Sequence, residues 1–356
     1  MRSTTGEYYL GLDHVRALAA FLVFVWHFIL VRDGHLAPPP IFPLSIFTEG
    51  HTGVALFMTL SGYLFAKLLD GKDINYLSFF CNRALRLLPL LSLVLLIIGI
   101  RDYFGGGHHF LYLRKVLAGI LLPVLPNGGW SVTVEFHFYL ALPLLLFLSK
   151  RVKYSLFAIV VLAVVLRCLF YLQTGEIQEL SYYTILGRVD QFILGICAFQ
   201  YRVWFKKQHL LAGIIFSVFM SFYWYFDSLG GFSGNSGYLS TNPIWIYLTT
   251  MEGLAYAALI AWYDNSFEHK PGLVSSFIAR IGTYSYSIYL LHFFFYEPLS
   301  SGIDKYVIEL SNIYVALFFA LLAFLIMVPI GYLSYRFIES PFLAYRTTYI
   351  RNKIYY

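Results

Sequence analysis

The sequence predicts an all-α polytopic membrane protein with about ten transmembrane helices, on the basis of three observations. Of the 356 residues, 59% are hydrophobic and only 12% are charged, whereas soluble domains carry roughly 25% charged residues. The mean hydropathy is +0.68. The apolar residues also fall into runs close to the roughly 20 residues that one membrane span needs. We therefore expect residues 1–356 to form a single integral membrane domain with no separate soluble domain.

The apolar runs give the order of the helices, and the charges between them give an orientation. The runs cover about 10–31, 50–69, 85–100, 130–149, 154–172, 186–201, 210–226, 243–262, 281–297 and 312–335. Ten spans place both termini on the same side. With the N-terminus inside, 17 Lys and Arg fall in inner segments and 5 in outer loops. By the positive-inside rule, both termini are therefore expected in the cytosol.

The first run, LDHVRALAAFLVFVWH, contains Asp13, Arg16 and His27 within an apolar stretch. Ionisable residues inside hydrocarbon are costly, so each is a functional-site hypothesis by default. Arg16 and His27 are 11 positions apart, so they share a helix face and lie about 16 Å apart along the axis. The plainer interpretation is that Arg16 snorkels to an interface and His27 is a satisfied packing residue.

The second and third runs add small residues and a pair of arginines. Ser61 and Gly62 in the second run are expected to permit close helix packing. Arg83 and Arg86, at the start of the third run, are one helical turn apart and face the same way if this segment is helical. Pro89 is then expected in an early turn of that helix. A pair of arginines at the cytosolic rim suits a phosphate-bearing ligand, although a topology anchor is the simpler interpretation.

The fourth run begins at Trp130 and carries polar residues along one helix face. Ser131, Glu135 and Tyr139 follow the i, i+4, i+8 spacing. Glu135 lies about 7 Å below the outer surface, close to the expected depth of His27. A carboxylate and an imidazole at one depth in hydrocarbon would either meet or share a watery cavity.

Later runs bring further ionisable groups towards the same layer of the membrane. They are Arg188 and Asp190 at the outer end of the sixth run, Glu252 near mid-depth in the eighth and His292 in the outer half of the ninth. An inert helical bundle would not need several such groups in one layer.

These segments resemble the acyltransferase-3 family of membrane enzymes, which transfer acyl groups to sugars and other hydroxyl acceptors. The resemblance covers nearly the whole chain in the family's order. It lies in the basic residue Arg16 followed by ten positions and His27, and in GVALFMTLSGYLF, RALR, WSVTVEFHFY, GRVDQFILG, TYSYSIYLLH and YRFIESP. Leu56-Phe57 replaces the aromatic pair often found in the second motif.

The resemblance implies O-acylation, foremost O-acetylation, of a cell-envelope saccharide or glycolipid, in the plasma membrane or a bacterial inner membrane. The donor would be cytosolic acyl-CoA, foremost acetyl-CoA, used as a co-substrate without a permanently bound cofactor. His27 would be the general base, oriented by Glu135, and Arg16, Arg83 and Arg86 would bind the donor. Candidates for acceptor binding or positioning are Asp13, Trp130, Ser131, Tyr139, Arg188, Asp190 and His292.

Other classes are weighed against this one. A secondary transporter also buries ionisable residues, but it favours inverted repeats and broken helices in matching halves, which the sequence does not display. A membrane acyltransferase of another fold would use a His/Asn pair, and none stands out. Cys81, Cys168 and Cys197 lack metal-site or disulfide spacing, and the dispersed basic residues argue against nucleic acid. The first run is expected to be a retained helix and not a signal peptide.

Overall fold

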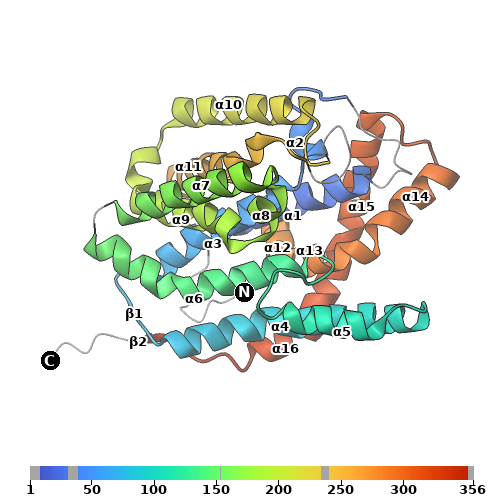
Figure 1. Ribbon diagram of the computed structural model, residues 1–356, viewed down its shortest axis with the longest axis horizontal. Coiled ribbons are helices and arrows are strands. Elements are labelled where there is room, and N and C mark those ends of the chain that lie inside the picture. Colours follow the sequence, from blue (N-terminus) through green and yellow to red (C-terminus); the bar gives the residue numbers. More distant parts are fainter. Residues whose placement is uncertain (1–8, 31–38, 153, 234–239, 352–356) are drawn as a thin grey trace.

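The computed structural model describes residues 9–30, 39–152, 154–233 and 240–351. Arg2, Arg32, Lys153 and Lys353, which contributed to the charge count, lie outside these ranges. The described chain is almost entirely helical (Figure 1). Its long helices are α1 Leu10–Leu30, α3 Thr52–Leu69, α4 Tyr76–Phe104, α6 Gly129–Arg151, α7 Ser155–Thr174, α9 Ile185–Gln200, α10 His209–Ser228, α11 Leu248–Ser266 and α15 Ile313–Ser334.

Short elements connect these helices. They are α2 Ser45–Thr48, α5 His109–Ala118, α8 Gln178–Tyr183, α12 Leu273–Thr283, α13 Ser285–Leu291, α14 Tyr296–Tyr306, α16 Ser340–Leu343, the 3-10 turns Arg202–Phe205, Pro243–Ile246 and His292–Phe294, and a π-helical turn Tyr335–Glu339. Two residues each of β1 Asp73–Ile74 and β2 Ile350–Arg351 pair antiparallel, with Asp73 opposite Arg351.

Seven helices in the described ranges are long and apolar enough to cross a membrane: α1, α3, α4, α6, α7, α10 and the segment Ile313–Leu343 that begins with α15. The other three predicted runs also form helices, but α9 has only 16 residues and the ninth run is broken. The chain is therefore a helical membrane protein, while the count of ten spans and the cytosolic termini stay predictions.

Helix α4 starts earlier than the sequence pattern suggested. The predicted run began near residue 85, whereas the helix begins at Tyr76, where the Asn75 side chain accepts a hydrogen bond from the Ser78 N–H at 3.2 Å. This is an N-cap, which satisfies one of the free N–H groups of the first turn. Pro89 consequently lies inside the helix and not in an early turn, which corrects that prediction. Arg83 and Arg86 are in the helix, one turn apart, as predicted.

The ninth predicted run is interrupted instead of forming one helix. The structure divides it into α12, α13, a 3-10 turn that starts at His292, and α14. A Cβ at Gly282 would lie 1.9 Å from the Asp13 carbonyl oxygen, so the end of α12 is in backbone contact with α1. The interruption turns the chain so that Tyr289 and His292 face the interior, where both are buried.

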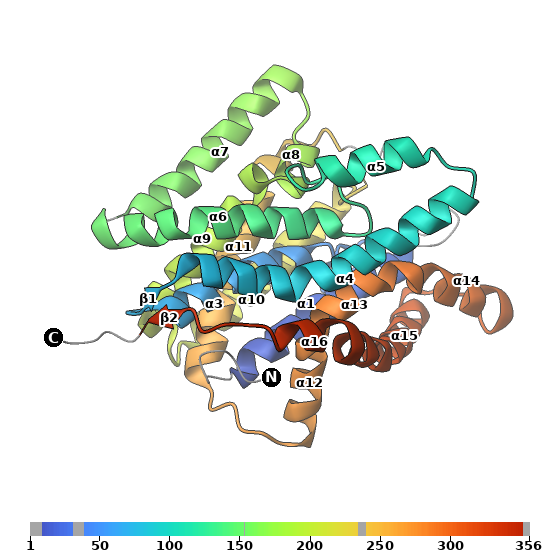
Figure 2. The same cartoon turned by 90° about the horizontal axis from the view of Figure 1, so that it is seen from below.

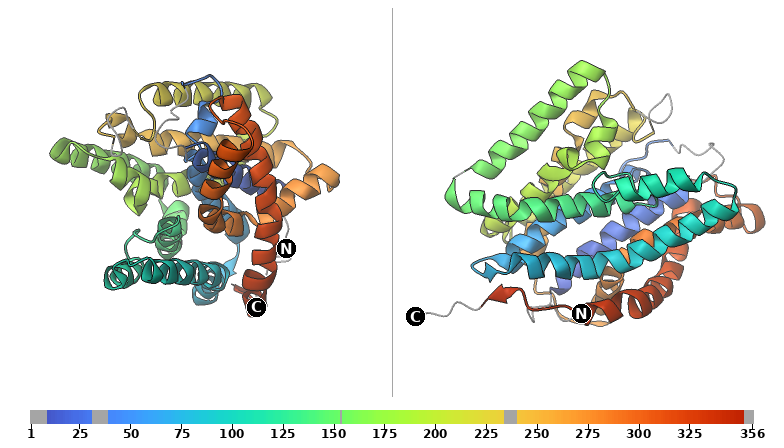
Figure 3. Two further views of the ribbon diagram at one scale, coloured as in Figure 1. Left: turned by 90° about the vertical axis from the view of Figure 1, so that its right-hand side faces the viewer. Right: turned by 60° about the horizontal axis from the view of Figure 1, so that its bottom comes forward.

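Helices α1, α3, α9 and α11 form the centre of the bundle, with α7 and α15 at opposite edges (Figures 2 and 3). A Cβ at Gly62 of α3 would lie 1.9 Å from the Phe192 carbonyl oxygen of α9, which confirms that small residues permit close helix packing here. The peripheral helices expose many apolar side chains, among them Leu162 of α7 and Phe318 of α15. Such surfaces suit contact with lipid.

Candidate active site

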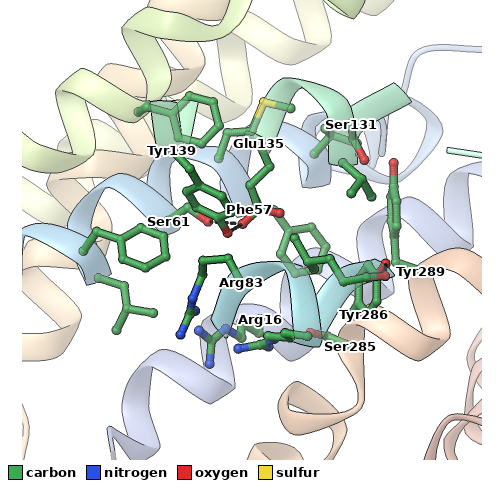
Figure 4. Close-up of a pocket in the computed structure, with 18 residues that line it drawn as sticks. Arg16, Phe57, Ser61, Arg83, Ser131, Glu135, Tyr139, Ser285, Tyr286 and Tyr289 are labelled. Carbon is green, nitrogen blue, oxygen red and sulfur yellow. Dashed lines mark hydrogen bonds between the residues drawn. The ribbon is translucent and has the colours of Figure 1, made fainter. Parts of the chain in front are cut away.

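A cavity of about 100 Å³ lies between α1, α3, α4, α6 and α13 (Figure 4). Its polar lining residues are Arg16, Ser61, Arg83, Arg86, Ser131, Glu135, Tyr139, Ser285, Tyr286 and Tyr289, and its apolar walls include Phe57 and Phe192. Six of the residues predicted for donor binding, catalysis or positioning therefore meet around one space, although they come from three helices far apart in the sequence.

Three arginines stand at one end of this cavity. Arg16 donates to the Asp13 carboxylate at 2.5 Å, within the same helix. Arg83 is 7% exposed, and its guanidinium lies over the rings of Phe65 and Phe79, at 5.3 and 5.6 Å from their centroids. Among the described residues, no carboxylate forms an ion pair with Arg83, and its Nε has no hydrogen-bond partner. This end of the cavity is thus a place where an anion would be stabilised.

The polar face of α6 lines the opposite wall, as the i, i+4, i+8 spacing predicted. Ser131, Glu135 and Tyr139 all border the cavity. The Tyr139 hydroxyl donates to Glu135 Oε1, and Ser61 Oγ from α3 lies 3.4 Å from the same oxygen. Ser131 Oγ donates to the Gly128 carbonyl oxygen at 2.8 Å. The carboxylate of Glu135 is therefore held by neighbouring hydroxyl groups.

His27 lies against His292 and not against Glu135. His27 Nδ1 is 2.9 Å from the Val23 carbonyl oxygen and 3.3 Å from His292 Nε2. His292 Nδ1 is 2.5 Å from the Tyr289 carbonyl oxygen. Among the described residues no hydrogen bond joins Glu135 to His27, and the part of Glu135 in orienting His27 stays a prediction. The break between α12 and α13 is where the chain presents the second imidazole, His292, to His27.

The backbone carbonyls fix the protonation pattern of this histidine pair. A carbonyl oxygen only accepts hydrogen bonds, so His292 Nδ1 carries a proton towards Tyr289 and, in the neutral ring, its Nε2 is the acceptor. His27 Nδ1 likewise carries a proton, shared between Val23 and His292. The remaining nitrogen, His27 Nε2, then holds the free lone pair, and it has no hydrogen-bond partner among the described residues. This is the arrangement that a general base requires.

Tyr289 links the cavity to the histidine pair. Its ring borders the cavity, and its centroid lies 6.0 Å from that of His292, which in turn lies 4.8 Å from that of His27. The Tyr289 hydroxyl donates to the Gly128 carbonyl oxygen at 3.2 Å. The arginine end and the imidazole pair are consequently separated by the cavity and one aromatic side chain.

The remaining predicted residues belong to a buried network beside the cavity. Arg188 donates to the Tyr182 carbonyl oxygen at 2.8 Å, lies over the Tyr182 ring and is 3.5 Å from Glu252. Asp190 forms a fully buried ion pair with Arg167 at 2.7 Å. Trp130 is 5.9 Å from the Arg188 guanidinium. These contacts link α6, α7, α9 and α11, although Arg167 Nε and Arg188 Nη2 have no hydrogen-bond partner among the described residues. Their predicted part in acceptor positioning stays a prediction.

Sequence reasoning missed several residues of the site. Tyr286 and Ser285 border the cavity from α13. Arg346 lies beside the Asn82–Arg83 stretch of α4, because the next residue, Thr347, is hydrogen-bonded to Asn82. Arg346 entered the sequence argument only as one of many inner charges, because nothing in its spacing links it to α4. Ser287, which donates to Glu339, also escaped notice. In the described part of the chain, no group of three or more His, Cys, Asp or Glu could hold a metal ion.

The family profile described as "Acyltransferase domain" matches residues 9–335, which is nearly the whole chain. The chain belongs to the acyltransferase-3 family. The resemblance read from the motifs is thus confirmed, and the transporter class is set aside. The acyltransferase-3 match spans every residue of the cavity and the histidine pair, and it ends before Arg346.

Relatives carry names that specify the acyl group. OatA of Staphylococcus aureus strain NCTC 8325, an O-acetyltransferase, is 24% identical over 377 residues, covering 94% of this chain and 57% of OatA. A Staphylococcus aureus protein of strain MRSA252, provisionally named an O-acetyltransferase, is 26% identical over 397 residues, covering 97% of this chain and 60% of the relative. The chain thus spans about three fifths of these relatives' length. No solved structure matches it.

Proposed function

We propose that this acyltransferase-3 protein is a membrane O-acetyltransferase that moves an acetyl group from cytosolic acetyl-CoA to a hydroxyl of a cell-envelope saccharide or glycolipid. The observation that carries the proposal is the cavity lined by Arg83 and Arg86, which form no ion pair with any described residue, and by Tyr289, which lies beside the His27–His292 pair. The names of the relatives support acetyl as the acyl group.

The donor's phosphates would bind at the arginine end. Arg83 and Arg86 lie one turn apart on α4 and both border the cavity, and a planar guanidinium can bind phosphate oxygens with two parallel hydrogen bonds. The excess of basic residues in the inner segments supports a cytosolic position for this end. Arg16 would steady the pantetheine arm beyond the phosphates, because its charge is already balanced by Asp13.

The acyl end of the donor would then reach His27, about 16 Å further along α1 by helix geometry. The hydroxyl oxygen of the acceptor attacks the thioester carbonyl carbon while His27 Nε2 takes the hydroxyl proton. The C–S bond breaks as the new C–O bond is completed, and the CoA sulfur leaves with that proton. His292 Nε2 accepts from His27 Nδ1–H, so it holds the imidazole orientation through the proton transfer.

Glu135 would have a different part from the one the sequence suggested. Since it accepts from Tyr139 and lies beside Ser61, it fixes two hydroxyl groups on the cavity wall between the arginines and Tyr289. We assign it to positioning of the pantetheine arm, together with Tyr139 and Ser131. Residues of this kind contribute by holding the thioester close to the attacking oxygen.

Mass spectrometry of cell-envelope glycans tests the proposal, using cells that lack the gene, cells that carry it and cells that carry the His27→Ala variant. We expect one acetyl mass on a defined sugar only where the unaltered gene is present. Identical glycans in all three would contradict the proposed reaction. An added mass larger than acetyl on that sugar would uphold O-acyl transfer and show that the acyl group is not acetyl.

A further inference from the structure

The C-terminal strap, defined here as residues 344–351, runs beside the start of α4 (Figure 2). It is fixed there by backbone contacts and not by its own side chains alone. The Asn82 side chain donates to the Thr347 carbonyl oxygen at 2.6 Å and accepts from the Thr347 N–H at 3.1 Å. The Asn75 N–H donates to the Tyr349 carbonyl oxygen at 2.7 Å, and Ile74 pairs with Ile350 in the β ladder.

These contacts set the strap firmly against the arginine end of the cavity. Asn82 is 1% exposed and immediately precedes Arg83 on α4. Tyr349 is also 1% exposed, and its ring packs against that of Phe79, with centroids 5.5 Å apart. Phe79 in turn lies under the Arg83 guanidinium. The strap is thus built into the same wall as Arg83.

The strap places one further arginine, Arg346, in this region. Its Nε and Nη2 are buried and have no hydrogen-bond partner in the part of the chain that the structure describes. Burial and then the charges of Arg86 and Arg83 lower the pKa of Arg346 to about 9. The hydrogen bonds between Asn82 and Thr347 place Arg346, the residue before Thr347, beside the turn of α4 that carries Arg83 and Arg86.

Two carboxylates near this cluster make their hydrogen bonds to other residues. Glu339 accepts from Ser287, and Glu135 accepts from Tyr139. Within the described residues, neither forms an ion pair with Arg83, Arg86 or Arg346. Removing one cation from water is already costly, and unpaired like charges repel one another. A ligand with several negative oxygens would offset both the desolvation cost and the repulsion between the arginines. A diphosphate or a phosphorylated ribose is such a ligand.

We propose that Arg346 completes a three-arginine phosphate site with Arg83 and Arg86, and that Asn82 is the positioning residue that holds Arg346 there through Thr347. The ligand is the phosphate part of the donor, so this inference rests on the proposed function for its ligand. Arg83 and Arg86 contact the phosphates from α4, and Arg346 contacts them from the strap. The phosphates are thereby bound between α4 and the C-terminal strap.

Calorimetry on the full chain in phosphatidylcholine nanodiscs tests the inference, with CoA and adenosine 3′,5′-diphosphate as probes. Arg346→Gln should weaken both by about tenfold to a hundredfold, as expected for lost hydrogen bonds to a charged group. Arg346→Lys should weaken them less, because it keeps the charge without the planar fork. Arg336→Gln removes a neighbouring exposed charge outside the cluster and is the matched control, which we expect to bind as the unaltered protein does.

Asn82→Ala tests the positioning part. It should weaken both probes, and the double variant with Arg346→Gln should bind no more weakly than Arg346→Gln alone, because the two act as a unit. A merely structural Asn82 would instead give additive losses. Circular dichroism and monodisperse gel filtration of each variant establish that the protein is folded.

The outcomes separate this inference from the proposed function. Unchanged binding of both probes by Arg346→Gln overturns the three-arginine site and leaves the acetyl donor in place. Arg346-dependent binding of adenosine 3′,5′-diphosphate without any acetyl transfer from acetyl-CoA upholds the site and removes the proposed reaction. If Arg346→Gln instead loses co-purified anionic lipid and binds CoA normally, Arg346 binds a lipid headgroup and the three-arginine site for the donor's phosphates is overturned.

Discussion

His292 Nε2 lies 3.3 Å from His27 Nδ1, and the backbone carbonyl of Tyr289 occupies the other nitrogen of His292. This makes His292 an acceptor that helps to hold the His27 ring with Nε2 free. The relationship joins α1 to a turn 265 positions away in the sequence. It is the geometry on which the proposed chemistry depends.

The first prediction concerns this pair. His292→Ala should lower kcat by about tenfold or more, which corresponds to roughly 1.4 kcal/mol in the barrier, while the KM for the donor changes little. His292→Gln, which keeps an acceptor near the position of Nε2, should restore part of the rate. The measurement is steady-state acetyl transfer by the purified protein. Equal kcat values for His292→Ala and the unaltered protein would show that His27 needs no partner.

The second prediction concerns Glu135. Because its partner is Tyr139, Glu135→Gln and Tyr139→Phe should each reduce kcat/KM, and the double variant should be little worse than either alone. Glu135→Gln combined with His292→Ala should instead give nearly additive losses, since no hydrogen bond joins these residues. Double-mutant cycles measured on kcat/KM distinguish the two patterns. Strong coupling of Glu135 to His292 would show that Glu135 acts together with the histidine pair, as the sequence suggested for Glu135 and His27.

The third prediction concerns the arginines of α4. Arg83→Lys and Arg86→Lys should each weaken CoA binding without changing the apparent affinity for the acceptor, because lysine keeps the charge but loses the planar fork. Arg86→Gln should cost more than Arg86→Lys at low salt, and the excess should shrink as salt rises. Arg151→Lys, at the exposed end of α6, is the control. If only membrane orientation changes and CoA affinity does not, these arginines are topology anchors.

The fourth prediction concerns stability. Gly62→Ala would place a methyl group 1.9 Å from the Phe192 carbonyl oxygen, so α3 and α9 must separate and the thermal midpoint in detergent should fall. Gly213→Ala on α10 meets nothing within 4 Å and should hold or raise the midpoint, since alanine favours a helix interior by about 1 kcal/mol over glycine. Equal midpoints for the two variants would contradict the close packing of α3 and α9.

Much of this arrangement follows from hydropathy and spacing. Each of the ten apolar runs contains helix, and the face of Ser131, Glu135 and Tyr139 points into the cavity as the i, i+4, i+8 pattern predicted. Helix formation and the direction of a polar helix face depend on one segment and on the lipid or water around it, so the local sequence predicts them. Depth in the membrane could also be estimated, because it needs only the order of the spans.

Partners across the bundle could not be predicted in the same way. Depth put His27, Glu135 and His292 in one layer, but it could not say which two touch. That depends on the interruption after α12, where Gly282 lies in close contact with the backbone of α1. The position of Arg346 likewise depends on hydrogen bonds between Asn82 and the backbone of Thr347, 265 residues away, and no periodicity in the sequence encodes these.

The central claim is that His27 is the base that removes the acceptor proton. The most direct measurement is single-turnover transfer of isotope-labelled acetyl from acetyl-CoA to the acceptor saccharide by purified His27→Ala protein, with donor affinity measured on the same sample. We predict unchanged acetyl-CoA affinity and a rate about 10² to 10⁴ times lower than that of the unaltered protein, the usual loss for a missing general base. Acetyl transfer at the unaltered rate by a variant that binds acetyl-CoA normally would contradict it.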